Sequence, residues 1–162
     1  MNLIEQYQIL HTQGKFPGTA IKGYVDEIGN VVRETGSQTL LDYGCGKAIY
    51  YREHKIHEKW GVPLPTLYDP GVPEYEKRPQ GRFDGVICTD VMEHLEAPLT
   101  VAAEIFGMAD KFVFMAISCV HSPAKKRLID GRPLHICVHP PEWWRERLEA
   151  PKGIRLELRF AT

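Results

Sequence analysis

From residue 38 onward, short apolar runs typical of β-strands alternate with segments of helical character. The expected strands cover residues 39–43, 66–69, 83–89, 111–118 and 154–160. Strands that alternate with helices form a mostly parallel sheet with right-handed crossovers, flanked by the helices. A chain of 162 residues is in the usual size range for one domain. The sequence therefore predicts a small α/β fold made of a single domain, residues 1–162.

The first 36 residues have a different pattern. Apolar side chains recur at helical spacing around residues 4–10 and again from Ile21 to Val32, and the segment Gly14–Gly18 separates the two runs. We expect residues 1–36 to form a helical lid over an α/β core of residues 37–162.

The charge balance is nearly even, with 20 basic and 21 acidic residues. This balance disfavours non-specific binding to nucleic acid or to a membrane surface. The basic cluster Lys125–Arg127 with Arg132 leaves an RNA partner open, although such a run is usually a solvated loop. The longest apolar run, Val113–Val120, is too short to span a bilayer.

The four cysteines include no C-x-x-C pair, and three of them lie in apolar, strand-like segments. No basic segment followed by an apolar stretch opens the chain. Buried, reduced thiols and a cytoplasmic location are therefore expected.

A glycine-rich turn follows the first expected strand, in the sequence Asp42-Tyr43-Gly44-Cys45-Gly46. Glycines permit positive φ angles and a close approach of a ligand to the backbone. A dinucleotide-binding loop would have a third glycine where Ile49 stands, and Asp42 would repel a pyrophosphate. This disfavours a nicotinamide-dependent oxidoreductase and favours a cationic ligand; the alternative is a simple glycine turn in which Asp42 caps the backbone.

The second expected strand ends at Asp69, directly before Pro70-Gly71. A carboxylate at this place can accept hydrogen bonds from both ribose hydroxyls of an adenosine cofactor. The alternative is that Asp69 opens an Asp-Pro-Gly turn.

Two blocks, Leu41–Gly46 and Phe83–Leu95, resemble motifs of the class I S-adenosylmethionine (SAM)-dependent methyltransferases. The resemblance implies a Rossmann-like fold and SAM as cofactor. It further implies that the glycine-rich turn surrounds the methionine part of SAM, that Asp69 holds the ribose, and that Thr89 lies beside the methionine end. The expected cofactor contacts are Asp42, Tyr43, Gly44, Cys45, Gly46, Tyr68, Asp69, Pro70 and Thr89.

The chain departs from the family pattern in two places. Only 13 residues separate Asp69 from Phe83, so the usual helix and strand between them are shortened or missing. The final hairpin of the family is reduced to one strand at Ile154–Phe160. We therefore expect a sheet with fewer than the family's seven strands.

A second constellation is Asp90-x-x-Glu93-His94, which would share one face at the start of a helix. It resembles the E-x-x-E-H motif, with a distant histidine, of metal-dependent O-methyltransferases. The resemblance implies a divalent metal ion (Mg²⁺, Mn²⁺ or Zn²⁺) held by Asp90, Glu93, His94 and His135. The alternative is that Asp90 caps the helix, Glu93 completes a capping box and His94 packs.

The alternating histidines and cysteines of residues 119–139 match no known spacing of zinc ligands, so we do not expect a separate zinc site there.

The predicted activity is methyl transfer from SAM to an oxygen or nitrogen of a small molecule, with His94 or His135 as general base. The N-terminal side chains Tyr7, His11 and Phe16 would cover the acceptor. Two alternatives remain open: a non-catalytic module that binds SAM or a nucleotide, and an RNA ribose O-methyltransferase. We expect no membrane partner, nucleic acid is the less favoured partner, and the protein would be a monomer or a homodimer.

Overall fold

The computed structural model describes all 162 residues and contains one five-stranded sheet in which every strand pair is parallel. The order across the sheet is β2-β1-β3-β4-β5. The strands are β1 (Leu40–Tyr43), β2 (Thr66–Tyr68), β3 (Phe83–Thr89), β4 (Ala109–Ser118) and β5 (Arg155–Ala161). This confirms the predicted α/β class, and every predicted strand is present.

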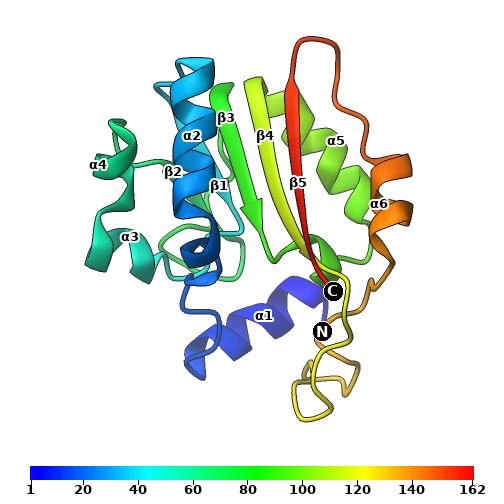
Figure 1. The fold of residues 1–162 in the computed structure, drawn as a ribbon. Coiled ribbons are helices and arrows are strands. Elements are labelled where there is room, and N and C mark those ends of the chain that lie inside the picture. Colours follow the sequence, from blue (N-terminus) through cyan, green and yellow to red (C-terminus); the bar gives the residue numbers. More distant parts are fainter.

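Helices cover both faces of the sheet, as Figure 1 shows. On one face lie α2 (Val25–Thr35), α3 (Ile49–His54) and α4 (Ile56–Trp60); on the other lie α5 (Pro98–Met108) and α6 (Pro141–Arg147). Neighbouring residues of β4 point into different helical layers, because side chains along a strand alternate between the two faces of the sheet. Phe112 and Phe114 are buried under the first group of helices, and Val113 and Met115 under the second.

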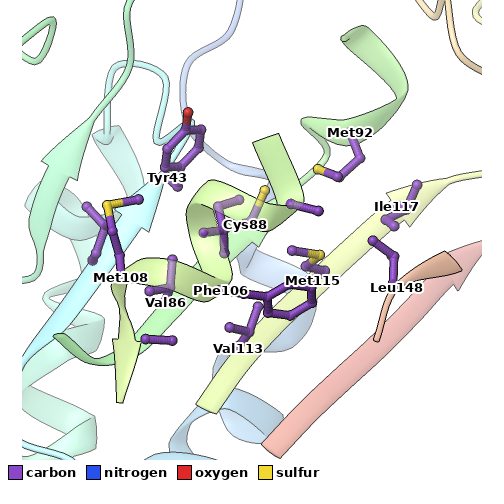
Figure 2. Packing of buried hydrophobic residues seen from close by; sticks show 14 of the residues in the cluster. Tyr43, Val86, Cys88, Met92, Phe106, Met108, Val113, Met115, Ile117 and Leu148 are labelled. Atoms are coloured by element: carbon purple, nitrogen blue, oxygen red, sulfur yellow. The ribbon is translucent and has the colours of Figure 1, made fainter. Parts of the chain in front are cut away.

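The layer beneath α5 and α6 is tightly filled with apolar side chains (Figure 2). Phe106 of α5 lies beside Val113 and Met115 of β4, and Leu148 approaches Ile117. Trp144 of α6 is fully buried in the same cluster. Close packing at this depth fixes α5 and α6 on the sheet, since shortening such a side chain typically costs about 2–5 kcal/mol.

For the segment after β1, the sequence predicts one helix over residues 47–60. In the structure, Lys55 adopts a left-handed conformation (φ 46°) and divides this segment into α3 and α4. The break lets Tyr51 of α3 and Ile56 and Trp60 of α4 all reach the core under α2. None of the helices is long and apolar enough to cross a membrane.

The expected shortening between β2 and β3 is confirmed. Residues 69–82 contain no helix and no strand, only turns such as the one closed by the hydrogen bond from Tyr75 N–H to the Val72 carbonyl (2.8 Å). The sheet therefore has five strands and ends at β2 on one side and β5 on the other.

The N-terminal residues cross the end of the sheet at which the strands finish (Figure 1). They form α1 (Leu3–Thr12) and the 3₁₀ helix η1 (Ala20–Tyr24) before α2 begins. Asn2 starts α1, because its side chain accepts from Glu5 N–H while the Glu5 carboxylate accepts from Asn2 N–H. α1 therefore lies over the carboxyl ends of the strands, where ligands of parallel sheets bind.

All four cysteines are free thiols. Cys45 and Cys88 are buried, whereas Cys119 and Cys137 are only half-buried. Of the three thiols expected to be buried in strands, Cys88 is buried, whereas the expectation is wrong for Cys119, which follows the end of β4, and for Cys137, which lies in a loop instead of a strand.

Candidate functional site

The turn after β1, which we call the glycine loop (Gly44–Ala48), is positioned by backbone hydrogen bonds. Gly44 and Gly46 have positive φ angles of 85° and 56°. The N–H groups of Gly44 and Cys45 both donate to the Tyr68 carbonyl (2.7 and 3.1 Å), and Gly46 N–H donates to Asp69 Oδ2 (2.9 Å). The end of β2 therefore holds the loop in place.

The glycine loop has no room for side chains at its two glycines. A Cβ on Gly44 would lie 2.3 Å from Val91 Cγ2, and a Cβ on Gly46 would lie 2.8 Å from the Phe16 carbonyl oxygen. Lys47 N–H also donates to that oxygen (3.2 Å). No pattern in the sequence predicts the Val91 contact, and the segment that contains Phe16 is predicted only as a break between two helices.

Asp69 holds two backbone groups at once. Besides accepting from Gly46, it accepts from Gly71 N–H through Oδ1 (2.8 Å), and His11 Nε2 lies 3.6 Å from the same oxygen. The Asp-Pro-Gly turn considered as an alternative is thus formed. Each carboxylate oxygen has two lone pairs, so Asp69 keeps capacity to accept hydroxyl groups as well.

Asp42 is buried under the glycine loop, and its Oδ1 has no hydrogen-bond partner. Burial raises the pKa of this carboxyl to about 7, and the charge of Asp69 adds to the increase. An unpartnered buried carboxylate is costly unless a cation or donor reaches it. Asp42 therefore fits a positively charged ligand.

The other expected cofactor contacts lie around the same strand ends. The rings of Tyr43 and Tyr68 pack edge to face with centroids 4.9 Å apart. Thr89 is buried at the end of β3, and the Pro70 carbonyl accepts from the Gln8 side chain of α1 (3.4 Å). The nine expected residues thus come from the ends of β1, β2 and β3.

Three residues from two separate segments form what we call the histidine cluster: Glu93, His94 and His135. One potential ligand atom from each lies within 4.8 Å of those of the other two. The two imidazole rings have centroids 4.9 Å apart and are nearly perpendicular. Glu93 and His94 belong to the 3₁₀ helix η2 (Met92–His94), and His135 comes from the loop after β4.

Backbone carbonyls orient both rings. His94 Nδ1 lies 3.0 Å from the Leu134 carbonyl, and His135 Nδ1 lies 2.7 Å from the Val120 carbonyl. Because a carbonyl only accepts, each Nδ1 carries the proton and each Nε2 keeps a free lone pair. Burial lowers the pKa of His94 to about 4, so this ring is neutral at physiological pH.

Glu93 has one anchored and one unpartnered oxygen. Its Oε1 accepts from Ser118 N–H (3.2 Å), whereas the buried Oε2 has no hydrogen-bond partner. Burial raises the pKa of this carboxyl to about 8. The Glu93 backbone carbonyl accepts from Ile136 and Cys137 N–H (2.9 and 3.0 Å), which brings the loop carrying His135 to the cluster.

Asp90, the fourth expected metal ligand, lies outside the histidine cluster. Its backbone turns into the left-handed region (φ 53°), its side chain is exposed, and η2 is a single 3₁₀ turn instead of an α-helix start. The shared helical face on which Asp90 was placed therefore does not exist. No side-chain capping bond forms at this turn, so the capping-box alternative is also absent.

The predicted lid residues surround His94. The Tyr7 and Phe16 rings have centroids 5.9 and 6.0 Å from the His94 ring, and His11 lies 5.2 Å from Phe16. The Tyr7 hydroxyl and His11 Nδ1 are buried without a hydrogen-bond partner. α1 thus delivers polar groups, as well as apolar cover, to the space between Asp69 and the histidine cluster.

The arginines of the basic cluster, which lies in the loop after β4 and which we call the basic loop (residues 125–132), bind groups of the same chain. Arg127 donates to the carbonyls of Ala124 and Gly131, and Arg132 pairs with Asp130 and Glu96. No cysteine belongs to the histidine cluster.

Comparison with protein families identifies the chain's relatives. A family model described as "Methyltransferase domain" matches residues 19–150, well over half of the chain. The chain belongs to this methyltransferase domain family. Membership, together with the five-stranded parallel sheet, supports the class I assignment and implies SAM as the methyl donor. No curated protein and no solved structure matches the chain.

Proposed function

We propose that this methyltransferase transfers the methyl group of SAM to an oxygen or nitrogen of a small molecule, at a divalent metal ion held by Glu93, His94 and His135. The observation that carries the proposal is the histidine cluster, whose three ligand atoms converge within 4.8 Å. Glu93 and His94 follow the end of β3 at Thr89, and Val91 of the same segment lies against Gly44 of the glycine loop.

The residues at the strand ends fit SAM, which supplies a methyl group on a positively charged sulfur. The Asp42 carboxylate, whose Oδ1 has no hydrogen-bond partner, offers a counter-charge for the ammonium of the methionine part, and the positive φ angles of Gly44 and Gly46 give the tight turn that follows β1. Asp69 would accept from the ribose hydroxyls with its remaining lone pairs. Tyr43, Cys45, Tyr68, Pro70 and Thr89 would line the same site.

The histidine cluster fits a divalent ion for three reasons. Glu93 Oε2 is buried and unpartnered, and both imidazoles have Nε2 free as acceptor. The His94 and His135 Nδ1 protons are held by carbonyls, an outer-shell arrangement common around histidine ligands. A bound ion would lower the pKa of the acceptor hydroxyl and fix its direction. One carboxylate and two imidazoles suit Zn²⁺ or Mn²⁺ better than Mg²⁺, which prefers oxygen ligands.

The two histidines have different capacities as general bases. With its pKa near 4, His94 takes a proton from an acceptor poorly and serves better as a ligand. His135 is half-buried, with Nε2 free, and is the better candidate to receive the proton.

The N-terminal segment supplies the enclosure that methyl transfer needs. Tyr7 of α1 and Phe16 of the loop after α1 lie against His94 and would limit the access of water to the cluster. The arginines of the basic loop are engaged with carbonyls and carboxylates of this chain, which disfavours RNA as the acceptor.

Ligand binding is tested first by thermal shift with SAM, S-adenosylhomocysteine, NAD and NADP. A ligand that binds only the folded state raises the melting temperature. We expect shifts with SAM and S-adenosylhomocysteine and none with the nicotinamide nucleotides. Stabilisation by NAD alone would contradict the assignment of the glycine loop.

Catalysis and the metal are tested with labelled SAM and a panel of small hydroxyl and amine acceptors, with EDTA-treated protein and after metal is added back. Transfer that EDTA abolishes and Mn²⁺ or Zn²⁺ restores supports the whole proposal. Transfer that is unchanged by EDTA would remove the metal and leave the methyltransferase intact. Binding of SAM without transfer to any acceptor would favour the non-catalytic module.

A further inference from the structure

The two edges of the sheet differ in length. β2 has three residues at one edge, whereas β5 has seven at the other and is paired only on its β4 side. An unpaired strand edge presents N–H and C=O groups that can pair with another strand, and short edge strands are one way in which proteins avoid this. β5 is therefore the edge that is suited to a further strand.

The orientation of the β5 backbone follows from two hydrogen bonds. Cys119 N–H donates to the Ala161 carbonyl (2.8 Å), so Ala161 faces β4. Backbone groups of alternate residues face the same side, and the β4–β5 register is continuous. The N–H and C=O groups of Leu156, Leu158 and Phe160 thus face the free edge. In agreement, the Leu158 carbonyl accepts from the Arg159 side chain (2.9 Å) and not from a strand.

The side chains of β5 divide into two faces. Leu156, Leu158 and Phe160 are half-buried against the core beneath α5 and α6. On the opposite face, Glu157 pairs with Arg155 (2.7 Å) and Arg159 (3.2 Å). The charges along this face therefore alternate in sign as Arg, Glu, Arg.

We propose that β5 pairs antiparallel with β5 of a second copy of this chain, across a two-fold axis at Leu158. This register uses all seven residues of the strand. It places Glu157 opposite the partner's Arg159, and the reverse, so that two opposite-charge pairs form. It also places Leu156 opposite the partner's Phe160, which extends the apolar layer across the interface.

The charges exclude the neighbouring symmetric registers. An axis at Glu157 would put this carboxylate opposite its own copy and Arg155 opposite the partner's Arg159. An axis at Arg159 would oppose two arginines. Like charges directly opposite each other destabilise a strand pair. An axis at Leu156 keeps opposite charges together but pairs only residues 155–157 of the strand.

In the single chain, two arginine side chains cover the free edge of β5, and both would have to move when a second copy pairs with this edge. Arg159 would give up the Leu158 carbonyl, which then accepts from the partner's Leu158 N–H. Arg145 lies over the Phe160 ring, with its Cζ 4.8 Å from the centroid, and covers the apolar side. Arginines on an edge also protect monomers, so a monomer with a shielded edge is the competing outcome.

The experiment measures the mass of the full chain by sedimentation equilibrium over a wide range of protein concentration. The wild type is expected to reach twice the mass of one chain. Glu157→Arg and, separately, Arg159→Glu place like charges opposite each other and should lower the association constant about tenfold or more. The double variant Glu157→Arg with Arg159→Glu restores opposite charges and should dimerise again.

The matched control is Glu58→Arg. Glu58 lies on α4, at the side of the sheet away from β5 (Figure 1), is exposed and pairs only with Lys55, so this variant should dimerise like the wild type. A cooperative melt verifies that each variant is folded. The proposal fails if the wild type stays monomeric at every concentration, if the single reversals leave the dimer intact, or if the double variant does not recover.

Discussion

The glycine loop and the histidine cluster lie at the same end of the sheet but are constructed differently. In the glycine loop, backbone N–H groups bind the Tyr68 carbonyl and the Asp69 carboxylate, and no Cβ fits at Gly44. In the histidine cluster, side chains from two distant segments converge, and the Glu93 Oε2 atom has no partner. The backbone groups of the glycine loop are paired within the protein, whereas the histidine cluster consists of side-chain atoms that are free to bind a ligand.

Because of this difference, the two regions are sensitive to different kinds of substitution. A loop made from backbone is disrupted by adding atoms, because a side chain at Gly44 would collide with Val91 and one at Gly46 with the Phe16 backbone. A cluster made from side chains is destroyed by removing one donor atom, while the backbone is unaffected. Substitutions can therefore test each region by opposite changes.

The largest effect is expected from Gly44→Val. Its Cβ would lie 2.3 Å from Val91 Cγ2, at a φ of 85° that β-branched residues avoid. Binding of SAM and S-adenosylhomocysteine in calorimetry should fall more than about 100-fold, and the strain should lower the free energy of unfolding by about 1–3 kcal/mol. Gly107→Ala, at a helical glycine with nothing within 4 Å, is the control. Normal binding by the valine variant would mean that this loop is not the cofactor cradle.

Glu93→Gln tests the opposite kind of change, the removal of one ligand oxygen. The amide keeps the shape of the side chain but ligates metal ions poorly, so affinity for Mn²⁺ or Zn²⁺ should drop about tenfold to 100-fold. Titration calorimetry on metal-free protein measures the loss. Glu96→Gln, three residues away and paired with Arg132 outside the cluster, should bind like the wild type. Equal loss in both variants would point to general surface electrostatics in place of ligation.

The two regions also differ in how far the sequence could predict them. The glycine loop and Asp69 directly follow predicted strands, and parallel strands bring their carboxyl ends together, so their proximity could be anticipated. Glu93 and His135 meet because Ile136 and Cys137 bond to the Glu93 carbonyl, a loop contact that no periodicity encodes. Asp90 was placed with them by helical spacing, and the left-handed turn at that residue removes it.

Asp69→Ala tests whether the carboxylate does more than shape its own turn. Loss of a charged acceptor should weaken S-adenosylhomocysteine binding by about 1.5–3 kcal/mol. Because Asp69 also holds Gly46 and Gly71, a smaller loss of stability is expected. An analogue without the ribose hydroxyls separates the roles: it should bind the wild type more weakly than the parent ligand, but the two should bind Asp69→Ala equally. If the variant still distinguishes them, Asp69 does not contact the ribose.

The most gradual effect is the pH dependence carried by Asp42, because it is spread over the whole range between the two pKa values of this carboxyl. Burial raises the pKa of this carboxyl from 3.8 to about 7, so the folded state favours its protonated form. Its contribution to stability is complete below pH 3.8 and is lost as the pH rises toward 7. Relative to Asp42→Asn, the free energy of unfolding of the wild type should fall by up to about 1.4 kcal/mol per pH unit in that window.

Binding of SAM should respond to Asp42 with the opposite sign. If the ionised carboxylate holds the ammonium group, affinity should rise by up to about tenfold per pH unit below pH 7 and level off above it. Asp42→Asn should bind more weakly and show little dependence on pH over this range. Parallel pH profiles of the wild type and the variant would show that Asp42 only supports the glycine loop, which would make that region a backbone site with no charge of its own.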